Sequence, residues 1–478
     1  MDAMNEKLLT AALDKALGRI TEETGLVGGV VNVIRQGRTV YTYHYGWADR
    51  ENRIPTDQDT LFDVASTSKA WTVMLAAQCV DEGLIGWDEP IQKAIPEFAM
   101  VDEYAGRHLS IRDMASHRSG LPGHDFMREK IYGDRENLMR KLALLEPNAG
   151  FRERYQYNNH MFILLGYLTE RLRGMRWEDQ ILRYIAEPLG VDPIRFRGYP
   201  QDMTGITAAL PYCSDGYRAE RCNYATNNYS APCGGIRISM KNMSKWIAAM
   251  SRGGVAESGA RLCSPEQYAQ IIAPVISAPE EDCGWLKNSS YAQGWVNADY
   301  LGTNVIFHSG GLTGFLTQVG FLPGKDCGYA MSFNTGSMPG HRVARAIVLD
   351  TLIRGRPEDS YDDMIDAWLR ERDEMRAKLA KNAAGTPITA QSHPDLAGTF
   401  RHPAYETFDI APGEDGVLRF EYGDFSARLV EEADGRITGY TGVLDGLTPA
   451  AIELRRQGGD LLLDAPDCGQ LLLFKREV

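Results

Sequence analysis

The 478-residue chain lacks any stretch of about 20 consecutive apolar residues, so no segment is long enough to cross a bilayer as a helix. Its first residues, Met1–Lys7, contain no basic region followed by an apolar core, and we therefore expect no secretory signal and a cytoplasmic location. Basic residues are outnumbered, since 51 Lys and Arg stand against 64 Asp and Glu. The net charge of −13 argues against nucleic-acid partners and anionic membrane surfaces.

Patterns that bind metals and cofactors are also missing. The eight cysteines are scattered without a C-x-x-C pair, which favours reduced thiols over a disulfide framework. The nine histidines lack metal-ligand spacing, and no H-E-x-x-H, G-x-S-x-G or phosphate-binding glycine loop occurs. We therefore expect no metal and no cofactor, and a substrate that is a small molecule or a peptide.

The order of hydrophobic patterns predicts an α+β domain over residues 1–355. Strand patterns occur near both ends of this region, at 28–35, 38–46 and 303–334. Helical patterns lie between and after them, at 66–190 and 341–354. The two ends of the region therefore supply one antiparallel sheet, and its middle supplies helices.

The remainder of the chain changes in character. Residues 356–395 form a predicted connector, with a charged helix and then an Ala-Ala-Gly-Thr-Pro stretch that is typical of a linker. Residues 396–478 show short alternating runs separated by Gly, Asp and Pro, which predicts a small antiparallel β-barrel. The clearest of these runs are 407–410, 417–422, 426–430, 460–463 and 470–475.

A serine and a lysine three residues apart, Ser66 and Lys69, give the strongest chemical signal. No other Ser in the chain is followed three residues later by Lys. An extended run at 61–65 precedes the pair, and apolar positions between 71 and 79 mark one face of a buried helix, which places Ser66 in its first turn. A lysine in an apolar pocket can take the proton of a serine hydroxyl, and a helix N-terminus favours an oxyanion beside it. The alternative is a helix-capping serine with a lysine on a solvated face.

Two later segments contain further candidates. Tyr157 and Asn159 precede an apolar helix; a phenol can carry a proton, and an amide can bind a substrate. Alternatively, Tyr157 packs at the start of that helix and Asn159 caps it.

The second segment ends an apolar strand with His308, Ser309, Gly310 and Gly311. Glycines allow a substrate backbone to lie along the strand edge, and the Gly311 N–H is placed to complete an oxyanion hole with that of Ser66. We therefore expect Ser309, Gly310 and Gly311 to bind the substrate. The alternative is a glycine-rich turn that follows a half-buried histidine.

In this order the three segments resemble the motifs of the serine β-lactamase-like superfamily, which includes class C β-lactamases, D,D-peptidases, D-aminopeptidases and family VIII-type esterases. The family pattern is S-x-x-K, then Y-x-N, then K-T-G or H-x-G; here the three are Ser66–Lys69, Tyr157–Asn159 and His308–Gly310. The resemblance covers about residues 10–355 and implies a β-lactamase/transpeptidase-like fold. Residues 396–478 resemble, more loosely, the lipocalin-like barrel attached to some of these hydrolases.

The resemblance also implies roles. Ser66 is acylated, Lys69 and Tyr157 shuttle its proton, Asn159 binds the substrate's amide carbonyl, and His308 sits beside Tyr157. One departure is informative, because β-lactamases and cell-wall peptidases usually have Lys in the third motif, where a permanent cation helps to bind the substrate carboxylate. A histidine is largely neutral at pH 7. Relatives with H-x-G are more often esterases, D-aminopeptidases, amidases or peptide-cyclising acyltransferases.

The resulting prediction is a serine hydrolase that acts through an acyl-enzyme on an amide or ester, with D-amino-acid-containing peptides or amides as the leading substrate class. An acyltransferase or peptide cyclase, of the penicillin-binding-protein-type thioesterase kind, would use the same residues and pass the acyl group to an amine. A non-catalytic sensor or filament-forming relative is the third alternative, and the complete set of catalytic residues argues against it. The acyl donor, the stereochemical preference, the role of the barrel and the formation of a homo-oligomer stay open.

Overall fold

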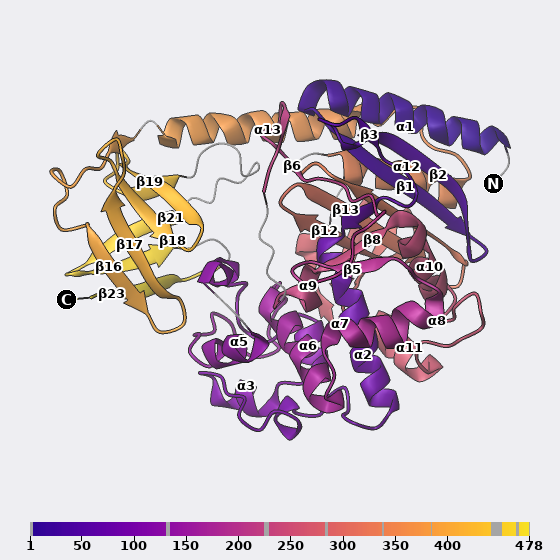
Figure 1. Ribbon diagram of the computed structural model, residues 1–478, viewed down its shortest axis with the longest axis horizontal. Coiled ribbons are helices and arrows are strands. Elements are labelled where there is room, and N and C mark those ends of the chain that lie inside the picture. The colour runs from indigo at the N-terminus through magenta and orange to yellow at the C-terminus, as the bar shows by residue number, and fades with distance from the viewer. Residues whose placement is uncertain are drawn as a thin grey trace.

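The computed structural model describes residues 3–130, 134–223, 229–282, 285–336, 339–383, 385–440, 452–464 and 468–477. Figure 1 shows an α+β body that contains the N-terminus, and a β-barrel at the opposite end of the molecule that contains the C-terminus. A long helix, α13 (Asp362–Ala383), runs from the body toward the barrel. The predicted α+β architecture followed by an antiparallel barrel is therefore confirmed.

The body is built on an antiparallel sheet to which both ends of its chain contribute. Of the described residues, nine strands form this sheet, in the order β3 (Ile54–Pro55), β2 (Arg38–Asp49), β1 (Gly28–Arg35), β14 (Cys327–Phe333), β13 (Phe315–Leu322), β12 (Thr303–Leu312), β11 (Val296–Tyr300), β10 (Leu286–Tyr291) and β9 (Ile276–Ser277). The β1–β2 hairpin is the one predicted from the alternating runs at 28–35 and 38–46. Strands β1 and β14 pair directly, which joins the N-terminal hairpin to the late strands.

Alternation along the strands divides the apolar residues between two cores. On β1, Val31 and Val33 face a core shared with α1 (Ala3–Thr24), α12 (Gly340–Arg354) and the start of α13. Val30 and Ile34 face the larger core on the other side, because successive side chains in a strand point to opposite faces. The N-terminal and closing helices thus cover one face of the sheet, and the helical region covers the other (Figure 1).

The helical region packs around α2 (Lys69–Asp81), whose residues from Lys69 to Cys79 are all buried. The sequence predicts a buried helix here, and in the structure neighbours enclose α2 on every side. The other helices of the region are α3 (Glu103–His108), α4 (Ile111–Ala115), α5 (Arg135–Leu142), α6 (Asn159–Arg173), α7 (Trp177–Ile181), the π-turn η4 (Leu182–Ala186), α8 (Glu187–Leu189), α9 (Ala231–Gly234), α10 (Met240–Ser251) and α11 (Pro265–Ile272). Short 3-10 turns occur at η1 (Ala65–Ser68), η2 (Ile91–Lys93), η3 (Asp125–Lys130) and η5 (Pro279–Glu281).

A small sheet places the segment before α2. It contains β4 (Leu61–Asp63), β8 (Ile236–Ser239) and β5 (Ile194–Phe196), with β8 in the centre. A separate hairpin joins β6 (Tyr212–Ser214) and β7 (Ala219–Arg221). The small sheet brings three segments together that lie far apart in the sequence, and each of them leads into the cavity described below.

The barrel is closed, because each strand from β16 to β23 pairs with the next and β23 pairs with β16. These strands are β16 (Gly398–His402), β17 (Glu406–Pro412), β18 (Leu418–Tyr422), β19 (Phe425–Glu431), β20 (Ile437–Tyr440), β21 (Ile452–Gln457), β22 (Asp460–Asp464) and β23 (Leu471–Arg476). The short β15 (Thr386–Pro387), within the predicted linker stretch, pairs with β19. Closure leaves the barrel proper without open edges.

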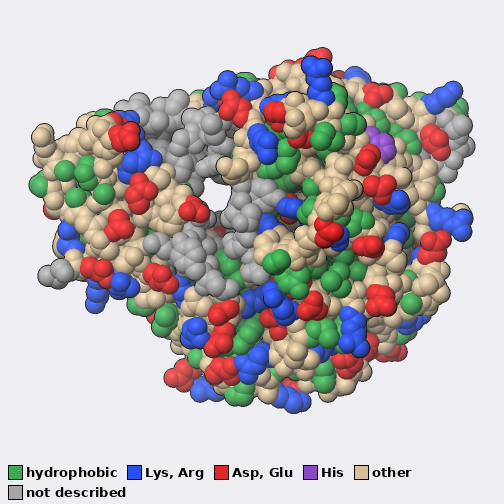
Figure 2. Space-filling view, viewed as in Figure 1, with side chains coloured by type: hydrophobic (Ala, Val, Ile, Leu, Met, Phe, Trp, Pro, Cys, Tyr) green, Lys and Arg blue, Asp and Glu red, His purple; other side chains and the backbone are tan. Residues whose placement is uncertain are grey.

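Figure 2 shows acidic and basic side chains interspersed over the visible face, without a broad area of one sign. Among the described helices, none combines the length and the apolar character needed to cross a membrane. Within the same residues, no group of three or more His, Cys, Asp or Glu side chains is arranged to hold a metal ion.

Candidate active site

Ser66 lies in the 3-10 turn η1, directly before α2, and not in the first α-helical turn that the sequence predicted. Strand β4 delivers the chain to this turn, and Ala65 adopts a left-handed φ of 48°. The turn packs closely against β12, because a Cβ on Gly310 would lie 2.3 Å from the carbonyl oxygen of Val64. Glycine at position 310 therefore allows the strand to approach the serine segment.

Lys69 is fully buried, which excludes the alternative of a lysine on a solvated face. Its Nζ donates to Ser66 Oγ at 2.9 Å and to Asn159 Oδ1 at 2.7 Å. A third hydrogen bond runs to the carbonyl oxygen of Cys233 at 2.9 Å. The side chain reaches these groups because α2 starts one residue after η1, which places Lys69 one turn from Ser66. Lys69 thus joins Ser66 of the first motif to Asn159 of the second by direct hydrogen bonds.

The residue that caps α6 is Asn158 and not Asn159. The Asn158 side chain accepts from the backbone N–H of Met161 at 3.1 Å, as an N-cap does. Asn159 is consequently free of the capping role, and its Nδ2 lies 3.0 and 2.9 Å from the two carboxylate oxygens of Asp125. Its amide therefore links Lys69 to Asp125.

The Tyr157 ring lies over the lysine, with Lys69 Nζ 4.8 Å from the ring centroid. Burial raises the pKa of Tyr157 well above its usual value, and a hydrogen bond with Ser66 opposes that rise. The ring also packs against the imidazole of His117, at 4.3 Å between centroids. Tyr157 is therefore a neutral phenol at physiological pH, next to both members of the Ser66–Lys69 pair.

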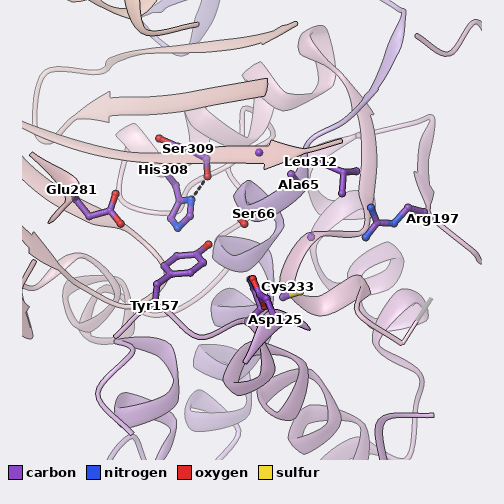
Figure 3. Close-up of a pocket in the computed structure, with 13 residues that line it drawn as sticks. Ala65, Ser66, Asp125, Tyr157, Arg197, Cys233, Glu281, His308, Ser309 and Leu312 are labelled. Atoms are coloured by element: carbon purple, nitrogen blue, oxygen red, sulfur yellow. Dashed lines mark hydrogen bonds between the residues drawn. The ribbon is translucent and has the colours of Figure 1, made fainter. Parts of the chain in front are cut away.

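His308 is 3% exposed and is held on both sides of its ring. Its Nδ1 lies 2.6 Å from the carbonyl oxygen of Ser309, which can only accept, so Nδ1 carries the proton (Figure 3). Its Nε2 then accepts from the hydroxyl of Tyr291 at 2.7 Å. Burial, and secondarily the nearby Lys69, lower the pKa of His308 to about 3. The ring lies 6.4 Å from that of Tyr157, so the two are neighbours, but the hydrogen-bond partner of His308 is Tyr291.

Strand β12 extends beyond its neighbour β11, whose pairing ends at Phe307. The segment from Ser309 to Leu312 keeps its pairing with β13 and has an open edge on the other side. Ser309 Oγ accepts from Gln318 Nε2 at 2.8 Å, whereas Gly311 is exposed and its Cβ position meets only Leu316 within 4 Å. An extended substrate can therefore add to this edge as a further strand.

These elements enclose a cavity of about 400 Å³. Its walls contain Ala65, Ser66, Asp125, Tyr157, Asn159, Arg197, Cys233, Gly234, Glu281, His308, Ser309, Gly311 and Leu312. Figure 3 places Ser66 between two ends, one with Tyr157, His308 and Glu281 and the other with Arg197 and Leu312. The residues predicted from the sequence thus gather at one cavity, with Lys69 bonded to Ser66 behind the wall and Gly310 packed against the serine turn.

The sequence did not single out Asp125, Arg197, Glu281 or Tyr291 as site residues. Each stands outside the three motifs, and only the folded chain shows that the first three reach the cavity. The Nδ1 of His117 accepts from the backbone N–H of Asn158, in the segment of the second motif, at 3.0 Å. None of these residues lies in a sequence motif that indicates catalysis or binding.

Comparisons with known proteins agree with this geometry. The family model described as Beta-lactamase matches residues 13–352. An unguisins hydrolase from Aspergillus campestris is 26% identical over 437 residues, which cover 85% of this chain and 79% of that protein.

Two solved structures share the fold over almost the whole chain. The octameric penicillin-binding protein homologue from Pyrococcus abyssi has a TM-score of 0.63 at 20% identity and covers 98% of this chain and 100% of that one. SurE with D-Leu has a TM-score of 0.60 at 16% identity, with both chains covered completely. The family match and the hydrolase relative support an enzyme of the serine hydrolase or acyltransferase kind. The chain belongs to the beta-lactamase family.

Proposed function

We propose that the enzyme cleaves an amide or ester through an acyl-enzyme on Ser66, and that its substrates are peptides or amides containing D-amino acids. The observation that carries this proposal is the 2.9 Å contact between Lys69 Nζ and Ser66 Oγ at the wall of the cavity. A serine hydroxyl needs a neighbouring base to become a nucleophile, and Lys69 is in place for that role.

Proton transfer assigns separate tasks to Lys69 and Tyr157. Burial disfavours the tyrosinate of Tyr157, so the neutral phenol is its starting form. In this proposal the base form of Lys69 is the one that accepts the Ser66 proton. Lys69 Nζ takes the Ser66 proton while Oγ attacks the substrate carbonyl. The tetrahedral intermediate collapses when the phenol gives its proton to the leaving amine or alcohol, and the proton on Lys69 then replaces it. Water attacks the ester of Ser66 by the reverse sequence and releases the acid.

Three groups position the substrate in this proposal. The backbone N–H groups of Ser66 and Gly311 bind the oxyanion, and the open edge of β12 pairs with the substrate backbone. The Nδ2 group of Asn159 carries two hydrogens; one serves the carboxylate of Asp125, and the other is directed to the carbonyl of the acyl residue. His308, neutral and held by Tyr291, adds no cation to the leaving-group side of the cavity.

One observation supports D-amino-acid substrates, and a second supports hydrolysis. A structural neighbour with the same fold was solved with D-Leu. The relative from Aspergillus campestris is named for the hydrolysis of unguisins, so a member of this family with similar length acts as a hydrolase. A neutral histidine in place of a permanent cation also argues against substrates that need a carboxylate bound at the third motif.

A neutral fluorophosphonate probe followed by peptide mass spectrometry tests the nucleophile. We expect labelling at Ser66 and none in Ser66→Ala. The matched control is Ser68→Ala, because Ser68 is a buried neighbour whose Oγ accepts from the backbone N–H of Ile236 at 3.1 Å. Labelling at another residue would overturn the assignment. Turnover of peptide pairs that differ only in the D or L configuration of the acyl residue then tests the substrate class, and equal rates would refute it.

The acceptor separates a hydrolase from an acyltransferase. Adding an amine such as a D-amino-acid amide during turnover gives an aminolysis product if the acyl-enzyme prefers amines, and only the free acid if it prefers water. We propose hydrolysis as the main reaction, because the relative that covers most of this chain is named a hydrolase.

We further propose a cytoplasmic homo-oligomer. The described cysteines form no disulfide, which suits a reducing compartment, and one structural neighbour is octameric. Light scattering of the purified full chain would give the oligomeric state directly, and a monomer at all concentrations would refute that part.

A further inference from the structure

Arg197 is a cation at the end of the cavity away from Tyr157. The chain reaches it directly after β5, and its backbone N–H donates to the carbonyl oxygen of Gly235 at 2.9 Å. Figure 3 shows the guanidinium end of Arg197 turned toward the cavity. Among the described residues that line the cavity, Arg197 is the one arginine and there is no lysine.

Among the described residues, none supplies this guanidinium with a counter-ion. Arg197 is 7% exposed, and its Nη2 donates to Ser230 Oγ over a long distance of 3.4 Å. Its buried Nε has no hydrogen-bond partner. Within the described part of the chain, no carboxylate forms an ion pair with it, although Asp125 lines the same cavity. A nearly enclosed cation without an anion is costly, and a bound anion would relieve that cost.

The position of Arg197 relative to the reacting serine decides which part of the substrate it meets. The leaving group has to lie near the residue that protonates it, which is Tyr157 in the proposed mechanism. Tyr157, His308 and Glu281 lie on one side of Ser66, and Arg197 lies on the other (Figure 3). The acyl portion of the substrate therefore extends toward Arg197.

We propose that Arg197 binds a carboxylate carried by the acyl residue of the substrate, so that the enzyme prefers acidic acyl residues such as D-glutamyl over their neutral isosteres. This inference rests on the proposed function, because that function defines the acyl side. A guanidinium is permanently charged and presents two parallel N–H groups that match a carboxylate. The neutral His308 supplies no such cation on the leaving-group side. The cation that recognises the substrate in this proposal is therefore Arg197, on the opposite side of the cavity from His308 of the third motif.

Matched substrates test the preference. The kcat/KM of N-acetyl-D-glutamyl p-nitroanilide is compared with that of the D-glutaminyl compound, which has the same shape without the charge. We expect wild type to favour the acidic compound by about 10- to 100-fold, the usual range for a hydrogen-bonded charge. Arg197→Gln should abolish the preference, and Arg197→Lys should keep part of it because the positive charge remains.

The control variant is Arg195→Gln. Arg195 lies two residues earlier and is directed to backbone carbonyl oxygens, those of Asp202 and Ile194, each at 2.9 Å. It loses the same charge and does not line the cavity. We expect the preference to stay at its wild-type value in Arg195→Gln. A wild-type enzyme without the preference, or Arg197→Gln with the full preference, would overturn the proposal.

Two further measurements separate this inference from the proposed function. Labelling of Ser66 by the neutral fluorophosphonate should be unchanged in Arg197→Gln, since the probe carries no carboxylate. Calorimetric binding of the α-amides of N-acetyl-D-glutamate and N-acetyl-D-glutamine, which differ only in the charge of the side chain, to Ser66→Ala protein reports the Arg197 site without catalysis. The corresponding L compounds show whether an absent preference for the acidic compound is due to the configuration that was tested. Equal binding of the acidic and neutral compounds in both series would refute the Arg197 site even if Ser66 is the nucleophile.

Discussion

The hydroxyl of Tyr405, in the barrel, lies 2.8 Å from Nδ1 of His124, in the body. The next residue along the chain, Asp125, accepts from Asn159, whose Oδ1 accepts from Lys69. A contact between the two units therefore holds the segment that supports the cavity. The same segment is clamped by Phe126, whose ring stacks on that of Tyr422 at 4.8 Å.

Removing the Tyr405 hydroxyl tests whether the barrel positions the site. Tyr405→Phe keeps the ring and leaves His124 Nδ1 and Cys468 Sγ without this partner. We expect Ser66 labelling to persist and KM for peptide substrates to change by about 2- to 30-fold, the range of coupling energies carried between connected groups, with a smaller change in kcat.

The control for this prediction is Tyr422→Phe. The Tyr422 hydroxyl donates to the carbonyl oxygen of Tyr405 at 2.9 Å, so its hydrogen bond stays within the barrel. Each variant should lose about 1 kcal/mol of stability, as expected for one hydrogen bond. If the two variants have the same kinetics as each other, the barrel does not position the site through His124.

Tyr157→Phe removes the proton carrier and keeps the aromatic packing on Lys69 and His117. We expect kcat to fall by about 10²-fold or more with a smaller change in KM, since proton transfer contributes in the transition state. A leaving group that needs no proton, such as p-nitrophenolate, should restore much of the rate. An equal loss for amide and p-nitrophenyl ester substrates would show that Tyr157 only shapes the cavity.

Much of the fold follows from local patterns. Alternation gave the β1–β2 hairpin, and the segment at 341–354 is helix α12. The sequence also predicts that α2 is buried, but not which elements pack against it, because periodicity within a helix carries no information on its neighbours. Within the barrel, β16, β20 and β21 were not among the predicted runs.

The candidate site divides in the same way. Ser66, Lys69, Tyr157 and His308 stand in short motifs whose spacing is visible in the chain. Arg197 and Glu281 reach the cavity only because β5 and η5 are brought to it by tertiary packing, and neither lies in a recognisable pattern. The choice between Asn158 and Asn159 as the cap also needed the structure, because adjacent asparagines are equivalent in composition.

The neutral third motif predicts poor β-lactam turnover. With its pKa lowered to about 3, His308 carries no charge between pH 5 and pH 9, whereas a lysine there would supply a permanent cation. We expect kcat/KM for benzylpenicillin and cephalothin to lie several orders of magnitude below the diffusional ceiling of about 10⁸ M⁻¹s⁻¹. His308→Lys should raise it if the variant folds, which near-UV circular dichroism would establish. Turnover by wild type near the ceiling would contradict the role assigned to His308.

Buried histidines should make the protein sensitive to acid. Burial lowers the pKa of His124 and His308 to about 3 and that of His402 to about 4, and it holds the pKa of His117 well below 6.5. In the unfolded chain these groups take up protons below about pH 6.5, while in the folded state they stay neutral. The unfolded state then binds more protons, so stability increases with pH in this window and is lost as the pH falls from about 6.5 toward 4.

Calorimetric unfolding at pH 5.5 in buffers of different ionisation enthalpy measures this proton uptake directly. His308→Gln should reduce the uptake by about one proton relative to wild type, because the unfolded histidine is protonated at that pH and the folded one is not. His108→Gln serves as the control, since His108 is exposed on α3 and its Nδ1 lies 2.8 Å from the carbonyl oxygen of Tyr104. An uptake that is the same in wild type and His308→Gln would mean that His308 is charged in the folded enzyme, and the leaving-group side of the cavity would then carry a cation after all.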